Sequence, residues 1–398
     1  MESDSFALEN ADRDQSPERR LKLLTQMGIA CLRRLDGWEK DVLPDGGGSG
    51  WKMSIVTGGL TNKLFRCTRI DSNESALVRV YGEATGAFFQ RKREEAIFEE
   101  LSRKGFGPKL LGKFPGGRIE EWINGCPISD AEMKCPASSA EIARILADLH
   151  SIDMRTLANG KNGECEPVIF SRLLSWSAAA ANAITHLERS RGSQCPILAR
   201  IKASGFIAKS ASSDDLPSEL MWLHSVLEKV AGPVVFCHHD VIAGNILRDT
   251  IAKKLRLIDY EYGDFDFRAM DLANHFNEWA ICYGIKSPPY FRVSPRKAYP
   301  SREKRVAFLT AYAERFLDQQ RSDNKNNNRT APVDDLVDDL EREVAAFAMA
   351  SDALWSLWAL IQAESSSIEE FDYAEYAVAR LGGYEARKAE WMHTYATS

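Results

Sequence analysis

The spacing of three polar residues, Asp240, Asn245 and Asp259, is the strongest constraint on how this chain can fold. Asn245 follows Asp240 by five positions, and Asp259 follows Asn245 by 14. Between the last two, the apolar stretches 246–247 and 255–258 predict two short strands joined by a polar turn. A hairpin returns the chain to its start, so we expect Asp259 to lie beside Asn245. Mg²⁺ prefers amide and carboxylate oxygens, and the spacing therefore predicts a metal site at Asn245 and Asp259.

The residues before the hairpin follow the pattern of a phosphoryl-transfer loop. His238, Asp240 and Asn245 match H-x-D-x-x-x-x-N, in which the Asp accepts the proton of the attacking hydroxyl and the Asn binds Mg²⁺. The alternative is a turn in which Asp240 and Asn245 only satisfy backbone groups. The hairpin that leads to Asp259 favours the catalytic interpretation, with Asp240 as the base.

A glycine-containing segment between two predicted strands, 51–57 and 63–70, is a candidate phosphate loop. Its backbone N–H groups, a hydroxyl and an amide can contact phosphate oxygens, although it matches neither a Walker A loop nor G-x-G-x-x-G. The alternative is an ordinary glycine hairpin. The residues are Gly58, Gly59, Leu60, Thr61, Asn62, Lys63 and Leu64.

Arg79 lies in the predicted strand 76–81, where a charge that points into the fold needs a partner. Protein kinases place a Lys on their third strand, and it pairs with ATP phosphates and with a Glu on a helix. We expect Arg79 and Glu94, which is in the predicted helix 87–104, to have these roles. The alternative is an edge residue that faces solvent.

The order of predicted elements indicates an α+β fold with two lobes around a cleft. Residues 1–50 are predicted to form an extension with one helix, 18–41, and a glycine-rich connector. Residues 51–124 predict a small β lobe with one helix against its sheet, whereas 125–398 are mainly helical and hold the candidate catalytic loop, metal site and substrate site.

Composition excludes several other classes. The net charge is −6 without a long Lys/Arg block, which argues against a nucleic-acid partner. The eight cysteines form no CxxC pair, and no HExxH motif occurs. The acidic start lacks the pattern of a signal peptide, and no uninterrupted apolar run reaches the length of a membrane span. We therefore expect a cytoplasmic protein with reduced thiols and no membrane span.

Four longer runs closely resemble choline and ethanolamine kinases, and the resemblance covers residues 51–395. They are 58–65, 257–262, 268–279 and 354–363. The resemblance implies a protein-kinase-like fold with a small antiparallel β lobe and a larger helical lobe. It also implies that the γ-phosphoryl group of ATP is transferred, with Mg²⁺, to the hydroxyl of choline or ethanolamine. That reaction is the first step of the CDP-choline and CDP-ethanolamine phospholipid pathways, and family members commonly form homodimers.

Roles for single residues follow from the resemblance. It makes Asp240 the base and makes Asn245 and Asp259 the Mg²⁺ ligands. At Ile242 the chain departs from the family, where Gln is frequent, and the Ile side chain cannot form a hydrogen bond. Besides the phosphate loop, the implied nucleotide contacts are Arg79, Ile242 and the adenine hinge Glu121, Trp122, Ile123, Asn124 and Gly125.

A substrate pocket is predicted from aromatic residues. Choline carries a quaternary ammonium group, which aromatic faces and carboxylates attract. Trp355 and Trp358 lie at i and i+3 of a predicted helix, and positions that match Tyr283, Trp355, Trp358 and Tyr376 line the choline site in the family. The alternative is that these rings belong to the core. The predicted substrate contacts are Asp240, Tyr283, Trp355, Trp358, Phe371, Tyr373 and Tyr376.

The choice between choline and ethanolamine depends on residues 114–121, whose Gly-Arg-Ile-Glu sequence looks more like choline kinases. We therefore expect choline as the substrate, with ethanolamine as a second. Three alternatives stay open: an ethanolamine-specific kinase, an aminoglycoside-type phosphotransferase, and a pseudokinase-like binding module. The run that contains Trp355 and Trp358 argues against an aminoglycoside-type phosphotransferase. The presence of Asp240, Asn245 and Asp259 argues against a pseudokinase-like binding module.

Overall fold

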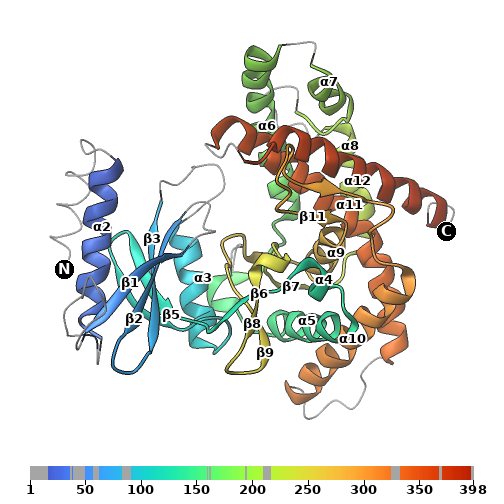
Figure 1. Cartoon of the computed structure of the whole chain (residues 1–398). Coiled ribbons are helices and arrows are strands. Elements are labelled where there is room, and N and C mark those ends of the chain that lie inside the picture. Colours follow the sequence, from blue (N-terminus) through green and yellow to red (C-terminus); the bar gives the residue numbers. More distant parts are fainter. Residues whose placement is uncertain are drawn as a thin grey trace. The chain divides into compact units, whose positions relative to one another are not determined.

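The chain divides into two compact units, Met1–Gly125 with Asp249–Ile251, and Cys126–Arg248 with Ala252–Ser398. Figure 1 shows the computed structural model of the whole chain. It describes residues 17–35, 38, 50–56, 62–82, 91–158, 160, 163–192, 195–208, 217–323, 332–366 and 370–395. The predicted connector 45–49 and Gly58, Gly59, Leu60 and Thr61 of the predicted phosphate loop lie outside these residues.

The first unit contains a five-stranded antiparallel sheet in the order β1-β2-β3-β5-β4. The three strands predicted at 51–57, 63–70 and 76–81 are present, and two more complete the sheet. Over part of β2 and β3, buried side chains alternate with partly buried ones, as expected for a sheet with one face on a core. The strands are β1 (Trp51–Val56), β2 (Asn62–Arg69), β3 (Ser75–Tyr81), β4 (Leu110–Phe114) and β5 (Gly117–Glu121).

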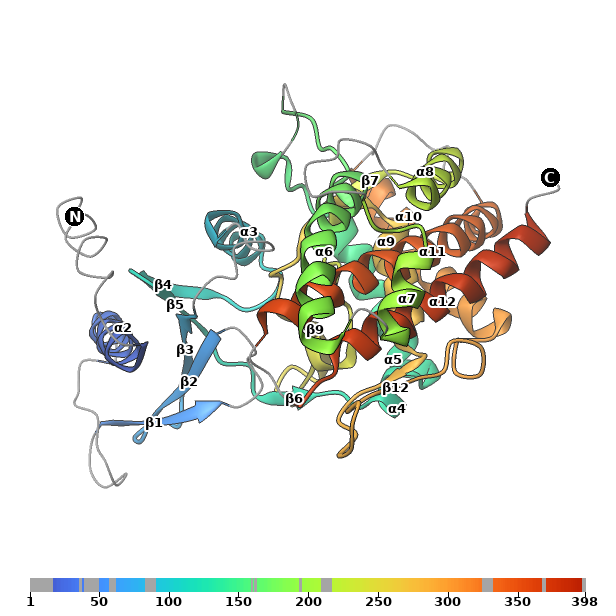
Figure 2. The same cartoon turned by 90° about the horizontal axis from the view of Figure 1, so that it is seen from above.

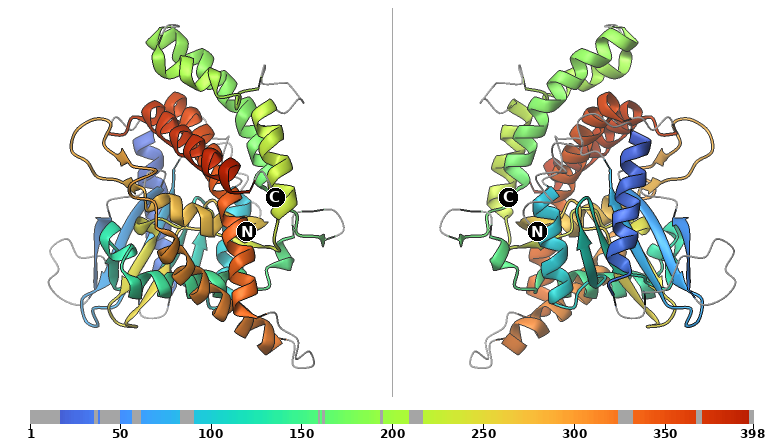
Figure 3. Two further views of the ribbon diagram at one scale, coloured as in Figure 1. Left: turned by 90° about the vertical axis from the view of Figure 1, so that its right-hand side faces the viewer. Right: turned by 90° about the vertical axis from the view of Figure 1, so that its left-hand side faces the viewer.

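Helix α2 (Pro17–Leu32) packs on this sheet, in addition to the predicted helix, which is α3 (Arg91–Arg103). The sheet therefore carries two helices rather than the one expected (Figures 1 and 3). Leu32 of α2 joins a core cluster with Trp51 and Val78 of the sheet. Gly28 allows this close approach, since a Cβ there would lie 2.7 Å from Cγ1 of Val78. The helix ends at Leu32, well before the predicted position 41, and residues 33–35 form a turn.

The second unit is built around the long helix α11 (Val333–Ser365), which packs against α6, α8, α9, α10 and α12 (Figure 2). Helix α7 was not predicted. The helices are α4 (Asp130–Met133), α5 (Pro136–His150), α6 (Ile169–Arg191), α7 (Pro196–Ala203), α8 (Ser218–Val230), α9 (Ala269–Glu278), α10 (Arg302–Asp323), α11 and α12 (Tyr373–Thr394).

Helix α11 is long and apolar enough to span a membrane by length and composition, with a mean hydropathy of 1.6 in its most apolar window. However, 89% of that window is buried inside the protein. The contacts of α11 with five other helices account for this burial. Its apolar composition is thus that of a central core helix.

Short strands flank the loops of the second unit along the chain. Strand β7 (Val234–Cys237) pairs with β10 (Asp264–Phe267), and β8 (Ile246–Asp249) forms the predicted hairpin with β9 (Lys254–Leu257), with β6 (Gly125–Pro127) beside β8. Helix α9 is shorter than the predicted 267–283 because β11 (Ile281–Cys282) follows it and pairs with β12 (Arg292–Val293).

We predict that Leu32→Ala lowers the free energy of unfolding by about 2–5 kcal/mol, because Leu32 is fully buried in the cluster between α2 and the sheet. Leu23→Ala on the same helix is the matched control. Leu23 is 37% exposed, and its truncation should change stability by less than about 0.5 kcal/mol. Denaturant unfolding measures both. Equal effects of the two variants would show that the packing of α2 does not stabilise the sheet.

Candidate active site

The predicted loop brings Asp240 and Asn245 into direct contact. The Asn245 side-chain nitrogen donates to the backbone carbonyl of Asp240 at 2.9 Å and to its carboxylate at 2.8 Å. The nitrogen is thereby committed to Asp240, so the amide oxygen is the atom of Asn245 that can bind a cation. The backbone N–H of Ile258 donates to the Asn245 carbonyl at 3.0 Å. The hairpin thus returns the chain to Asn245 one residue before Asp259, as the spacing predicted.

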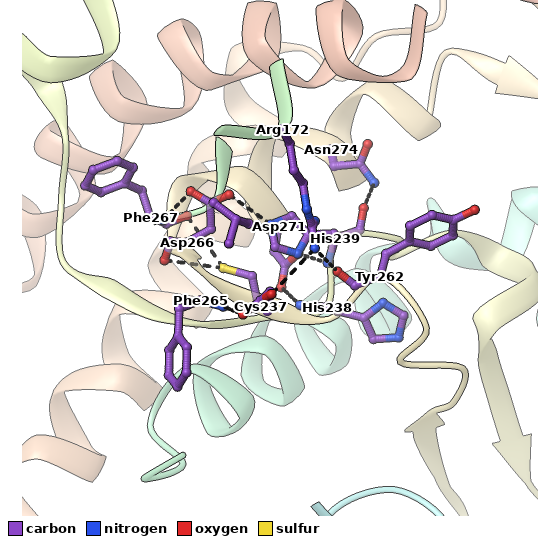
Figure 4. A network of polar contacts seen from close by, with 12 residues as sticks. Arg172, Cys237, His238, His239, Tyr262, Phe265, Asp266, Phe267, Asp271 and Asn274 are labelled. Atoms are coloured by element: carbon purple, nitrogen blue, oxygen red, sulfur yellow. Dashed lines mark hydrogen bonds and ion pairs between the residues drawn. The ribbon is translucent and has the colours of Figure 1, made fainter. Parts of the chain in front are cut away.

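The carboxylate of Asp271 anchors the start of the loop. It accepts hydrogen bonds from the backbone N–H groups of His238 at 2.7 Å and His239 at 2.6 Å (Figure 4). His150 Nε2 lies 3.1 Å from the same carboxylate, and the Tyr312 hydroxyl is 2.8 Å from His150 Nδ1. Burial alone would raise the pKa of Asp271, but the hydrogen bond from His150 and the nearby histidine charges lower it to about 2. Asp271 is therefore an ionised anchor for the loop.

One face of α9 supplies the other contacts to this loop. Four buried polar residues of α9 have the i, i+3, i+4, i+7 spacing of a single helix face: Asp271, Asn274, His275 and Glu278. Asn274 donates to the His239 carbonyl at 3.1 Å, and His275 Nδ1 donates to the Val241 carbonyl at 3.0 Å. Burial lowers the pKa of His275 to about 4, so it is a neutral hydrogen-bond donor at neutral pH.

Two residues next to the chemistry adopt the left-handed backbone conformation, His239 with φ +67° and Asp259 with φ +67°. A residue other than glycine in this region carries a conformational cost that the surroundings must offset. For His239 they do so through Asp271 and Asn274 on its backbone and through Asp266, whose carboxylate lies 3.0 Å from its Nε2.

The donor chemistry of the site fits a hard divalent cation. Burial and the nearby carboxylates of Glu278 and Asp259 raise the pKa of Asp240 to about 8. Such a concentration of like charge is relieved by a bound cation, and Asn245 and Asp259 offer oxygen ligands. Among the described residues, His150, Cys237 and Asp271 are also close enough to share a metal, but their polar atoms already bond to Tyr312 and to backbone groups. We assign that cluster to the scaffold.

The six predicted aromatic residues of the substrate pocket form one continuous chain of ring contacts. Successive ring centroids are 5.2, 5.7, 4.8, 5.2 and 6.4 Å apart. The order along the chain is Trp355, Trp358, Tyr373, Phe371, Tyr376 and Tyr283. They come from three segments that are distant in sequence, so the fold gathers them in one place.

A carboxylate lies at the Tyr283 end of this chain of rings. Glu278 accepts the Tyr283 hydroxyl at 2.8 Å, and the Tyr283 and Tyr376 hydroxyls are 2.9 Å apart. Arg380 donates to Glu278 at 2.8 Å and also lies 2.8 Å from the Asp352 carboxylate. One guanidinium shared by two carboxylates leaves a formal charge of −1 when both acids are ionised. Burial raises the pKa of both Glu278 and Asp352, the latter to about 6, and a cation beside the aromatic rings would favour their ionised forms.

Two further aromatic residues contact this chain of rings. Tyr262 accepts a hydrogen bond from Nε1 of Trp358 at 3.0 Å, and Phe291 lies 5.1 Å from Phe371 and from Tyr376 by ring centroids. Burial raises the pKa of Tyr262, and the charges of Glu261 and Asp240 add to the shift. The Tyr262 ring also lies 5.3 Å from that of Trp355, so Tyr262 belongs to the same group of aromatic residues.

In the first unit the expected pairing of Arg79 with Glu94 is wrong. Arg79 donates to Glu120 at 2.6 Å, whereas Glu94 accepts from Arg118 at 3.0 Å and from Arg91 at 2.9 Å. Strand register explains this, because β3 pairs with β5 and brings Arg79 opposite Arg118, and Arg118 also donates to Glu120 at 2.8 Å. Burial would raise the pKa of Glu120, but Arg79 and Arg118 lower it. Arg79 is buried, so the alternative of a solvent-facing residue is wrong as well.

The other predicted nucleotide contacts lie on two elements of the first unit and on the catalytic loop. Asn62, Lys63 and Leu64 begin β2, and Asn62 accepts the backbone N–H of Gly82 at 3.4 Å. In the predicted hinge, Glu121 ends β5, Trp122 stacks under Arg66 at 4.5 Å, Ile123 is buried, and Gly125 begins β6. The Asn124 carbonyl accepts the backbone N–H and the hydroxyl of Thr250. Ile242 shapes the catalytic loop through its backbone, which bonds to Asp240 and Asn245.

A cavity of about 660 Å³ in the second unit contains none of the predicted site residues. Its walls come from α10, α11 and α12 and include Arg302, Glu341, Arg387 and Trp391. Charged groups dominate it, and Arg302 and Glu341 are already paired at 2.7 Å. The predicted chemistry is therefore elsewhere.

Sequence reasoning gave no role to Asp271, Asn274, Glu278, Phe291 or Arg380. A pattern in the sequence could have identified the first three, because they are polar residues at i, i+3 and i+7 of a predicted helix. In the structure this helix is buried on all sides, so its polar side chains need partners. Phe291 and Arg380 had no such signal. Their contacts depend on segments 80 to 102 residues away in sequence.

An antiparallel sheet unit, a helical unit and a His-x-Asp loop beside a hard-ligand site define a protein-kinase-like phosphotransferase that acts on an alcohol group. The family model described as choline/ethanolamine kinase matches residues 53–385. The chain therefore belongs to the choline/ethanolamine kinase family.

Single relatives agree with this assignment. Choline kinase alpha of Mus musculus is 32% identical, with 94% of this chain and 82% of the relative covered. A probable ethanolamine kinase of Arabidopsis thaliana is 30% identical, with 85% and 80% covered. The crystal structure of choline kinase from Cryptosporidium parvum Iowa II superposes with a TM-score of 0.70 at 26% identity, covering 93% of this chain and 96% of that one.

We predict that Asp271→Asn destabilises the fold by an amount that depends on pH. The pKa of Asp271 is about 2 in the folded protein, below its ordinary value of 3.8, so its stabilising effect is complete above pH 4 and disappears as pH falls toward 2. The free energy of unfolding of the wild type should exceed that of the variant by on the order of 2 kcal/mol at pH 6, and this difference should disappear near pH 2. Denaturant unfolding from pH 2 to 6 measures it. Asp153→Asn, at an exposed ion pair, is the control, and an identical pH profile for both variants would contradict the anchor role.

Proposed function

We propose that the protein phosphorylates the hydroxyl of choline with Mg·ATP to give phosphocholine, and that ethanolamine is a second substrate. One observation carries the proposal: a chain of six aromatic rings closes on the Glu278 carboxylate, and Glu278 is near enough to Asp240 to raise its pKa. A small cation with a hydroxyl group can then occupy the pocket with its hydroxyl toward Asp240. Phosphocholine made in this way would feed the CDP-choline pathway of phospholipid synthesis.

In the proposed reaction Asp240 orients the substrate hydroxyl and accepts its proton as the oxygen attacks the γ-phosphorus. Asn245 holds the Asp240 carboxylate at 2.8 Å and so fixes the direction in which it accepts. The ionised state that a base needs is costly beside Glu278 and Asp259. A cation at the substrate pocket, on the Glu278 side, lowers that cost.

Mg²⁺ would be held by the side-chain oxygens of Asn245 and Asp259, and it would neutralise charge on the transferred phosphoryl group. In the first unit, Arg79 and the start of β2 would contact the nucleotide phosphates, and Glu121 to Gly125 would flank the adenine. The ion pair with Glu120 fixes the Arg79 side chain at 2.6 Å, and a fixed cation is what a phosphate contact requires.

Choline is favoured over ethanolamine by the composition of the pocket. A quaternary ammonium group has no N–H to donate, so it binds through aromatic faces, of which the pocket supplies eight with Tyr262 and Phe291. The Gly-Arg-Ile-Glu sequence gives no contact-based support, because Arg118 is buried in the ion pairs of the first unit.

The deciding assay uses purified protein, Mg·ATP and three parallel substrates: choline, ethanolamine and an aminoglycoside. We expect phosphocholine formation with the highest kcat/KM, slower turnover of ethanolamine, and none of the aminoglycoside. Omission of Mg²⁺ should abolish turnover. If ethanolamine alone is phosphorylated, the choline assignment is wrong, and if no substrate is phosphorylated, the proposed function is wrong.

We predict that Asp240→Asn lowers kcat by about 10²–10⁴, the range for loss of a general base. The same change should not lower the melting temperature of the metal-free protein, because it removes a carboxylate from beside Glu278 and Asp259. Phosphocholine assays and thermal unfolding measure the two effects. A variant that keeps most of the turnover would refute the role of Asp240, and a variant that melts early would show that the lost activity reflects misfolding.

A further inference from the structure

A chain of four hydrogen bonds between buried groups connects the cation pocket to the catalytic loop. Arg380 donates through Nη1 to Glu278 at 2.8 Å and through Nη2 to the Ser351 hydroxyl at 3.1 Å. Ser351 donates to Oδ1 of Asn274 at 2.8 Å, and Nδ2 of Asn274 donates to the His239 carbonyl at 3.1 Å. Every member of the chain is at most 4% exposed, so water cannot substitute for a lost bond.

From Arg380 onward, each hydrogen bond is donated in the same direction, from the Arg380 guanidinium toward the catalytic loop. Arg380 is the first donor. The Ser351 hydroxyl accepts from Arg380 and donates its one hydrogen to Oδ1 of Asn274. The Nδ2 of Asn274 in turn donates to the His239 carbonyl. Aligned bonds of this kind polarise one another in a low-dielectric interior. Each member has a set donor and acceptor direction, so a change at Arg380 alters the bond that the next member can make.

The far end of the chain acts on the peptide group directly before the base. The His239 carbonyl belongs to the same peptide as the Asp240 backbone N–H, which donates to His238 Nδ1 at 3.2 Å. His239 is in the left-handed conformation, which the surrounding contacts must maintain, so this peptide can turn toward a less strained conformation if those contacts weaken. Its orientation sets the direction of the Asp240 side chain.

The near end of the chain lies at the substrate. Glu278 is the carboxylate of the cation pocket, and Arg380 is shared between it and Asp352. A cation that binds beside Glu278 adds a second positive charge next to the carboxylate that Arg380 contacts through Oε1. The strength of the Arg380 to Glu278 bond therefore depends on whether the pocket is filled.

We propose that Arg380, Ser351 and Asn274 are positioning residues that couple the charge of the bound substrate to the orientation of Asp240. The coupling rests on the proposed function, since it requires a cationic substrate at Glu278. It makes turnover, and not only binding, depend on the positive charge of the substrate. A neutral alcohol of the same shape would occupy the pocket without adjusting the loop.

The test is Ser351→Ala, which removes one hydroxyl from the middle of the chain and leaves Arg380 and Glu278 in place. Choline is compared with 3,3-dimethylbutan-1-ol, its neutral isostere, in single turnovers with excess enzyme. We expect the choline rate to fall about tenfold, as for one lost buried hydrogen bond. The choline Kd and the rate for the neutral alcohol should change by less than about twofold, because neither involves the coupling.

Ser356→Ala is the matched control. Ser356 is a buried serine on the same helix, and its hydroxyl donates to the Ala377 carbonyl at 2.9 Å, away from the chain. We expect neither substrate to be affected in this variant. Arg380→Lys keeps the charge but cannot reach Glu278 and Ser351 with two nitrogens, and it provides a second break in the chain if Ser351→Ala does not fold.

Two results would overturn the coupling. Equal losses for choline and the neutral alcohol would mean that Ser351 only supports the fold. A raised Kd for choline with an unchanged rate would mean that it only shapes the pocket. Failure of the proposed function is distinct from both, because the wild-type enzyme would then not phosphorylate choline at all.

Discussion

The carboxylate of Asp271 accepts the N–H groups of two successive peptides, at His238 and His239, and the rest of the active site depends on this interaction. Two donors on one acceptor fix the chain direction just before Asp240 and stabilise the left-handed backbone of His239. A fully buried carboxylate is costly unless its hydrogen bonds are satisfied. The His150 contact and the two backbone donors meet that requirement, and the low pKa of Asp271 is the result.

Helix α9 carries the contacts of the catalytic loop and of the aromatic chain on one rigid element. Asp271, Asn274 and His275 bond the loop, and Glu278, one turn later, accepts the hydroxyl of Tyr283 in the aromatic chain. Because these side chains lie on one helix face, the distance between the loop and the pocket is fixed by helix geometry rather than by a flexible linker. Glu278 is thereby joined rigidly to the residues that hold the catalytic loop, which is the geometry that the proposed coupling requires.

The first unit is organised by buried charge. Arg79, Glu120, Arg118 and Glu94 form a continuous series of ion pairs inside the sheet and its helix α3. The two arginines and two glutamates balance in charge, and the ion pair with Glu120 holds the Arg79 side chain in place. Helix α2 precedes the region matched by the family model, which begins at residue 53, yet its Leu32 is part of the same core as Trp51 and Val78.

Local patterns in the sequence determined the strands of the first unit, the β8–β9 hairpin that returns Asp259 to Asn245, and the types of residue that a kinase site needs. They could do so because strand alternation, turn composition and loop spacing are properties of adjacent residues. Only the tertiary structure decided that Arg79 meets Glu120 rather than Glu94, that α2 covers the sheet, and that Arg380 contacts Glu278 across 102 residues. These pairings depend on strand register and helix packing between distant segments, where burial forces each charge to take the partner that the fold brings nearest.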